Sequence, residues 1–184
     1  HQLDLERSRL VAAQSVAKIG SWETDLTTLA VIWSAETHRI FETDPIRHQP
    51  SHESFLEFVH PEDRMRVDEA FVRSLNEPAG QGLEHRLLLP DGRVKFVEEH
   101  WQIIRDDQNK PVRAIGTCQD VTQRKLGEKR IKETEERYHA LFDRSLDAVY
   151  VHDLAGRFVD ANPAALQLLG YSREEVGKVS FADI

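Results

Sequence analysis

Three consecutive strand-like stretches joined by two short turns constrain the fold of this chain most. Residues 83–89 and 93–105 flank Pro90-Asp91-Gly92, residue types that favour a hairpin turn. A second turn, from Asp106 to Pro111, precedes residues 112–121. Side chains in the three stretches follow a period of two, and strands joined by such short turns run antiparallel. The segment therefore predicts a three-stranded antiparallel meander.

The segment before the meander predicts two short strands and a capped helix. Trp22, Thr24 and Leu26 fall on one face of a strand, and Val31 to Trp33 continue as a second strand. Ser34 is a typical N-cap residue for the short helix that follows. Short strands, a helical middle and a meander together indicate an α+β domain with an antiparallel sheet.

Two more helices are expected between the capped helix and the meander. Phe55, Phe58 and Val59 follow the i, i+3, i+4 spacing of a helix face. His60-Pro61-Glu62-Asp63 is expected to open the longest helix of the domain, with proline in its first turn.

Amphipathic stretches flank this domain on both sides. Residues 1–18 carry apolar residues every seven positions, which fits either a helix packed on its own domain or a coiled-coil arm. Residues 122–142 contain no proline and predict a continuous connector helix. Five apolar positions on the two helices are candidate contacts in a homodimer: Leu3, Leu10, Ile131, Tyr138 and Leu141.

The opening of the domain is repeated near the end of the chain. A shift of 128 residues places Asp153 on Asp25 and Asn162 on Ser34 without a gap, and it also aligns Leu168 with Ile40 and Leu169 with Phe41. Repeated sequence units usually mean repeated folds. We therefore expect four regions: an amphipathic helix at 1–18, a complete domain at 19–121, a helical connector at 122–142 and the first half of a second domain at 143–184. The half domain is expected to be mobile or to lean on the connector or a partner chain, since two short strands do not make a stable sheet alone.

Composition and motifs exclude several classes of function. A net charge of −8 argues against contacts with nucleic acid or an anionic membrane. The apolar runs are too short to cross a bilayer, and the amino end lacks the apolar segment of a signal peptide. Cys118 is the single cysteine, which excludes an internal disulfide and a multi-thiolate metal site. Catalytic motifs such as a phosphate-binding glycine loop or His-Glu-x-x-His are absent from the sequence, so we expect a non-catalytic fragment. We expect the fragment to be cytoplasmic, which is compatible with a membrane anchor elsewhere in its parent protein.

Several short motifs, in this order and spacing, resemble the PAS domain superfamily and its "PAS fold 3" branch. The matching segments are Ile19-Gly20-Ser21-Trp22-Glu23, Trp33-Ser34, Phe58-Val59-His60-Pro61-Glu62-Asp63, Glu84 with Arg86, Pro90-Asp91-Gly92, and Asp120-Val121-Thr122-Gln123-Arg124-Lys125. The second copy is similar to the commoner PAS opening, at Asp160-Ala161-Asn162-Pro163 and Leu169-Gly170-Tyr171-Ser172. The resemblance implies a five-stranded antiparallel sheet with helices on one face.

The resemblance also implies a sensory and regulatory role. PAS domains bind small ligands or cofactors, dimerise and pass a signal through an adjacent helix, here through Asp120 and Thr122, to an output domain. A bacterial sensor histidine kinase is the expected parent protein. A diguanylate cyclase or phosphodiesterase parent and a ligand-free dimerisation scaffold remain alternatives.

Strand alternation selects candidate residues for a ligand pocket between the sheet and the helices. Apolar members of this set would be buried in a ligand-free core as well. A buried carboxylate at Glu99 and a buried His85 need hydrogen-bonding partners, which are either each other, water or a polar ligand. The candidates are Trp33, Phe41, Phe55, Phe58, His85, Leu87, Val97, Glu99, Trp101, Ile103, Ala114 and Cys118.

The cofactor is left open by the sequence. Light-sensing PAS relatives attach flavin to a cysteine on the long middle helix, and residues 61–76 contain none, which argues against a covalent flavin. Haem-binding relatives use an axial histidine, but the motif around His60 explains that residue as part of a helix start. Noncovalent flavin and haem remain possible. A metal site is not expected, because Pro50 separates His48 from His52.

Overall fold

The computed structural model describes residues 12, 14, 16–76 and 80–183. The chain divides into two compact units, His1–Lys125 and Leu126–Ile184. The helix predicted for residues 1–18, with the candidate contacts Leu3 and Leu10, falls largely outside the described residues.

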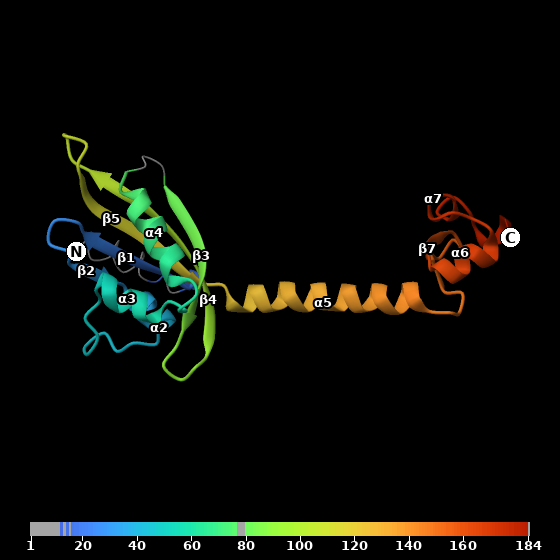
Figure 1. Ribbon diagram of the computed structural model, residues 1–184, viewed down its shortest axis with the longest axis horizontal. Helices are drawn as coiled ribbons and strands as arrows, with labels where there is room; N and C mark the ends of the chain where they lie inside the picture. The colour runs from blue at the N-terminus through green and yellow to red at the C-terminus, as the bar shows by residue number, and fades with distance from the viewer. Residues whose placement is uncertain (1–11, 13, 15, 77–79, 184) are drawn as a thin grey trace. The chain divides into compact units, whose positions relative to one another are not determined.

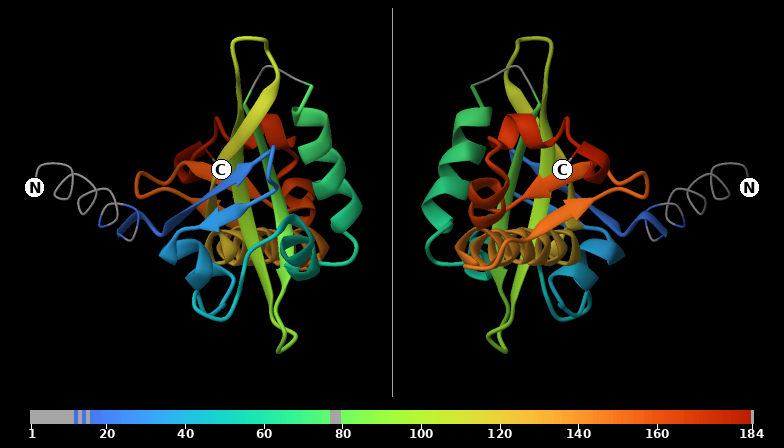
Figure 2. Two further views of the ribbon diagram at one scale, coloured as in Figure 1. Left: turned by 90° about the vertical axis from the view of Figure 1, so that its left-hand side faces the viewer. Right: turned by 90° about the vertical axis from the view of Figure 1, so that its right-hand side faces the viewer.

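The first unit contains a five-stranded antiparallel sheet (Figure 1). Its strand order is β2-β1-β5-β4-β3, with β1 at Ile19–Asp25, β2 at Val31–Trp33, β3 at Gln81–Leu88, β4 at Val94–Arg105 and β5 at Pro111–Asp120. Consecutive strands β3, β4 and β5 are antiparallel neighbours, so the predicted meander is confirmed. Figure 2 shows its two turns at opposite ends of the sheet.

The residue types in these turns explain where the strands end. Gly92 has a φ of 85°, which suits a residue without a Cβ. Asp106 accepts hydrogen bonds from the backbone N–H groups of Gln108 and Lys110 through Oδ1. Local side-chain bonds of this kind replace the strand ladder and close the turn.

Three helices cover one face of the sheet (Figure 1). They are α2 at Ala35–Ile40, α3 at His52–Phe58 and α4 at Arg64–Ser74. The N-cap predicted at Ser34 is confirmed, because its side chain accepts a hydrogen bond from Thr37 N. Between helices and sheet lies the core of the unit, built from Trp33, Ile40, Phe41, Leu87, Val97 and Cys118.

The predicted start of the long helix is wrong by one turn. Pro61 and Glu62 lie in a turn before α4, and Asp63 is the N-cap residue without a side-chain capping bond. The Asp63 carboxylate binds Arg86 on β3 instead, which withdraws it from its own helix. Val59 is bridged to Leu87, and His60 N donates to Arg86 O, so pairing with β3 keeps the chain extended up to His60 and delays the start of the helix.

The second unit repeats the opening of the first. It holds most of α5 (Thr122–Arg144), then β6 (Tyr150–His152), β7 (Phe158–Ala161), α6 (Pro163–Leu169), α7 (Arg173–Val176) and a short turn of 3₁₀ helix at Phe181–Asp183. Asn162 caps α6 as Ser34 caps α2, and Asp153 accepts backbone bonds in its turn as Asp25 does. The internal repeat is thus present in the structure.

The half domain is attached to the connector helix. The buried Asn162 donates from Nδ2 to the carbonyl oxygens of Phe142, Ser145 and Asp147. Leu168, by contrast, is 74% exposed, whereas its counterpart Ile40 is 5% exposed. Phe158, Ala161, Ala165 and Val176 form a small buried core, and the partly buried side chains of Ala148, Leu166, Tyr171 and Val179 pack against it.

Candidate ligand cavity and its link to helix α5

A small cavity of about 50 Å³ lies between the inner sheet face and the helices of the first unit. Strands β1, β3 and β4 supply its floor, and α3 and α4 supply part of its wall. The lining residues are Trp22, Thr24, Val31, Trp33, Thr37, Phe41, Ser51, His52, Phe55, Val67, Phe71, Leu83, His85, Glu99 and Trp101.

One carboxylate is buried at this cavity. Glu99 is 6% exposed, and its Oε1 lies 3.5 Å from Nε2 of His85, which is 3% exposed. On the other side, register pairs Glu99 directly with Cys118 on β5. Burial raises the pKa of the Cys118 thiol, and the neighbouring Glu99 raises it further, so the thiol stays protonated and donates to the carboxylate.

Two buried polar atoms at the cavity have no hydrogen-bond partner among the described residues. They are Nε2 of His85 and Nε1 of Trp22. The third tryptophan of the lining, Trp101, differs because its indole N–H donates to Ser74 Oγ at 2.9 Å. Unpaired buried polar atoms are rare and destabilising, so these two indicate space for a polar molecule.

Strand β4 also holds the start of α5. Phe96 donates its backbone N–H to Thr122 Oγ1 at 2.9 Å and accepts from Val121 N at 2.8 Å. Asp120 Oδ1 accepts from Thr122 N. Glu99 and Trp101, at the cavity, are therefore three and five residues from the strand position that anchors the connector helix.

Charged side chains add a second link between the sheet and α5, which we call the latch and define as Glu84, Glu98, Arg124 and Lys125. Register places Glu84 on β3 directly opposite Glu98 on β4. Arg124 binds both carboxylates, at 3.0 and 2.9 Å, and Lys125 also binds Glu84. The hydrogen bond from Lys125 is the main cause that lowers the pKa of Glu84 below its ordinary value. The helix thus neutralises a pair of like charges that would repel each other.

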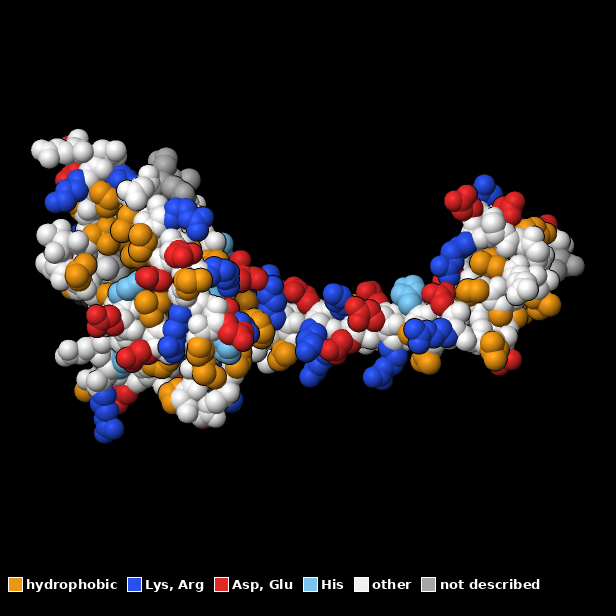
Figure 3. Space-filling model, in the orientation of Figure 1, with side chains coloured by type: hydrophobic (Ala, Val, Ile, Leu, Met, Phe, Trp, Pro, Cys, Tyr) orange, Lys and Arg blue, Asp and Glu red, His pale blue; other side chains and the backbone are white. Residues whose placement is uncertain are grey.

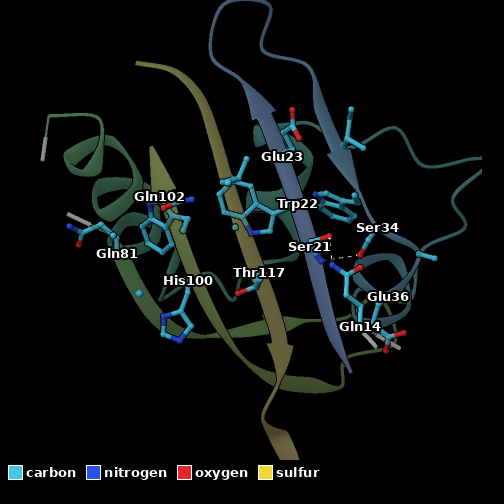
Figure 4. A pocket seen from close by; sticks show the side chains of 18 of the residues that line it. Gln14, Ser21, Trp22, Glu23, Ser34, Glu36, Gln81, His100, Gln102 and Thr117 are labelled. Atoms are coloured by element: carbon cyan, nitrogen blue, oxygen red, sulfur yellow. Dashed lines mark hydrogen bonds between the residues drawn. The ribbon is translucent and has the colours of Figure 1, made fainter. Parts of the chain in front are cut away.

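The outer face of the sheet carries a broad open groove (Figure 4). At one side of the groove, Gln14 donates to Ser21 Oγ, and Ser21 N donates to Ser34 Oγ. The rest is lined by polar side chains such as His100 and Thr117 and by apolar ones such as Ile32 and Ile115.

Comparison with known proteins identifies both units. A family model for the PAS fold matches residues 30–118, and a model for the PAS domain matches residues 136–184. The chain belongs to the PAS domain superfamily. Its PAS domains are similar to those of sensor proteins, as the following matches show.

The sensor protein FixL of Bradyrhizobium diazoefficiens is 26% identical over 158 residues, which are 85% of this chain and 31% of FixL. The two-component sensor PprA of Pseudomonas aeruginosa is 35% identical over 118 residues, 60% of this chain and 12% of PprA. The solved structure of a sensory box histidine kinase/response regulator from Burkholderia thailandensis superposes with a TM-score of 0.60 at 26% identity, covering 72% of this chain and 99% of that one. This chain therefore spans less than a third of the curated relatives it matches.

The structure separates the predicted pocket residues of the first PAS domain into two groups. Trp33, Phe41, Phe55, His85, Glu99 and Trp101 line the cavity. Phe58, Leu87, Val97, Ile103, Ala114 and Cys118 do not line it, and most of them are packed in the core. Ligand contact remains a prediction for the first group.

Sequence reasoning missed several lining residues, including Trp22, Thr24, His52 and Phe71. The alternation of Trp22 with Thr24 places both on one face of β1, and Phe71 lies on the apolar stripe of α4. Those patterns could have identified three of them. His52 gives no such signal, because it enters through tertiary packing and binds Asp68 at 2.8 Å.

Neither a flavin nor a haem fits the cavity as it stands. Pockets for ligands of that size measure roughly 300–1,000 Å³, far above the volume found here. His60 lies outside the lining, and its Nδ1 accepts from Glu62 N in the turn before α4. Within the described part of the chain, no group of three or more His, Cys, Asp or Glu residues could hold a metal ion.

Helix α5 is highly charged, with both signs along its surface (Figure 3). The candidate dimer contacts Ile131, Tyr138 and Leu141 are 62%, 45% and 70% exposed, and Tyr138 stacks on Phe142. Their role in a dimer remains a prediction. None of the described helices is apolar enough over a sufficient length to cross a membrane.

Proposed function

We propose that this chain is the sensory and relay part of a sensor histidine kinase. In this proposal, a small polar molecule binds the cavity of the first PAS domain and changes the position of α5. The similarity to sensor proteins supports the class of parent protein. The buried groups at the cavity support ligand binding.

One observation carries the proposal: the buried Glu99 carboxylate at the cavity and the anchor of the connector helix share strand β4. Glu99 and Trp101 line the cavity, and the backbone of Phe96 is hydrogen-bonded to the side-chain hydroxyl of Thr122. A ligand that pairs with Glu99 favours one position of β4 over another. Phe96 and Glu98 of the latch lie on β4 and move with it. The ligand therefore also shifts the balance between two arrangements of α5.

Native mass spectrometry and an absorption spectrum of freshly purified protein from its own host test the proposal. We expect a small bound molecule that is retained by the Glu57→Gln variant and lost from Glu99→Gln. Glu57 is exposed on α3, so its variant removes the same charge away from the cavity. A ligand-free wild-type protein that also shows no melting shift with cell metabolites would contradict the proposal.

The native mass spectrum also tests a second candidate function, a dimerisation scaffold, because it reports the oligomeric state. This function is favoured by the exposed apolar side chains of Ile131 and Leu141 on α5. A dimer without any bound molecule is the result that supports the scaffold over the sensor.

A further inference from the structure

We infer that the cavity selects a compact organic cation, such as a primary ammonium compound. This inference rests on the proposed sensor function and names the class of its ligand. It is derived from the charge and the wall of the cavity.

The cavity contains one buried acid and lacks a strong base to neutralise it. Glu99 is the carboxylate, and no lysine or arginine is among the described residues that line the space. Lys95 lies four residues earlier on β4, but its ammonium group binds the Ile40 carbonyl oxygen and the Glu42 carboxylate, both at 2.8 Å. A buried carboxylate without a cationic partner is unfavourable.

Neither of the two histidines that line the cavity makes a hydrogen bond with Glu99. His85 Nε2 is 3.5 Å from Glu99, is almost fully buried and makes no hydrogen bond with another described residue. His52 binds Asp68 through Nε2. A ligand nitrogen beside this pair, within hydrogen-bond distance of both atoms, would donate to Glu99 Oε1 and to His85 Nε2.

Aromatic rings form a large part of the wall, beside smaller residues such as Thr37 and Val67. Trp33 lies 4.5 Å from Phe41, Phe41 lies 6.0 Å from Phe55, and Phe55 lies 5.8 Å from His85, measured between ring centroids. On the other side, Phe71 lies 6.3 Å from Trp22 and 6.5 Å from Trp101. Ring faces attract cations, and a cage of rings with one carboxylate is suited to an ammonium group.

Volume limits the size of this cation. A water molecule occupies roughly 10–15 Å³ of such a cavity, so about 50 Å³ holds roughly three or four non-hydrogen atoms. The unpaired Trp22 N–H is a further donor, which an oxygen of the ligand or a retained water would accept.

Three probes with four non-hydrogen atoms each and different charges test the inference: isopropylammonium, 2-propanol and acetate. They are titrated at neutral pH into ¹⁵N-labelled protein, and the indole N–H signals of the three tryptophans are followed by NMR. We expect isopropylammonium to shift the Trp22 signal saturably and to bind about tenfold more tightly than 2-propanol, with acetate weakest. Glu57→Gln should keep this preference and Glu99→Gln should lose it.

Equal or tighter binding of 2-propanol or acetate would overturn the cation inference while leaving the cavity as a ligand site. Failure of all three probes to shift any indole signal would also overturn it, and native mass spectrometry then decides the sensor function separately. If Glu99→Gln does not fold, the ranking of the three probes on the wild-type protein still decides.

Discussion

At the scale of single residues, Asp63 and Arg86 hold α4 against the sheet. Asp63 is 8% exposed and accepts three hydrogen bonds from Arg86: one from its backbone N–H, one from Nε and one from Nη2. These bonds hold the pKa of the Asp63 carboxyl far below its ordinary value. Charge-assisted, bidentate bonds to a buried carboxylate are among the stronger side-chain interactions.

Replacing Asp63 by Asn should lower the free energy of unfolding at pH 7 by about 1–3 kcal/mol, because the charge-assisted bonds to Arg86 are lost. Urea denaturation measures this value. The control is Asp107→Asn, at an exposed position, which should change stability by less than about 0.5 kcal/mol.

The difference between wild type and Asp63→Asn should depend on pH in one direction. A carboxyl with a lowered folded pKa stabilises the fold at pH values above its unfolded pKa of about 3.9, and this contribution is lost as the pH falls. The difference between the two proteins should therefore begin to shrink below about pH 4 and go on shrinking as the pH falls toward the much lower folded pKa of Asp63. A constant difference from pH 7 to pH 3 would show that the Asp63 charge contributes nothing.

At the scale of elements, the latch joins β3 and β4 to α5. Its side chains are between 30% and 49% exposed, so each ion pair contributes little by itself and is weakened by salt. Its effect is on position, because Arg124 holds two strands and one helix together. Weak contacts of this kind suit an element that must move in response to a ligand.

A double-mutant cycle on Glu98→Gln and Arg124→Gln should give a coupling energy of about 0.2–1 kcal/mol at low salt that shrinks in high salt. The same cycle between Glu98→Gln and Lys132→Gln is the control, since Lys132 pairs with Glu136 within α5 and its effect should be additive. Additivity of Glu98 with Arg124 as well would rule out the latch.

Elements with strong local signals were predictable from the sequence. The turns at Gly92 and Asp106, the N-cap at Ser34 and the repeated cap at Asn162 depend on neighbouring residues, and the structure contains all of them. The start of α4 was mispredicted because Val59 and His60 pair with β3, more than twenty residues away, which keeps the chain extended before the turn.

The candidate site was predictable only in part, for the same reason. Strand alternation identified Glu99 and Trp101, since facing follows from a period of two. Whether an inward residue meets the cavity or the packed core depends on helices that approach from elsewhere in the chain. Val97 and Leu87 face inward and are fully buried but do not line the cavity.

At the scale of the whole molecule, α5 is bonded to a PAS unit at each of its ends. Thr122 is hydrogen-bonded to Phe96 in the first PAS domain, and the Phe142 carbonyl accepts from Asn162 in the second. Along the rest of α5 most side chains are exposed, so few packing contacts oppose a change in the position of this helix. We therefore expect a shift of β4 to reach the start of the connector helix through the bond between Phe96 and Thr122.

Hydrogen exchange of α5 tests this account most directly. Mass spectrometry compares the wild-type protein with Glu99→Gln, which perturbs the cavity, and with Glu57→Gln, which removes the same charge at the surface. The account predicts that Glu99→Gln alters amide exchange both in β4 and in residues 125–132, and that Glu57→Gln alters neither. Altered exchange around the cavity with an unchanged α5 would contradict it.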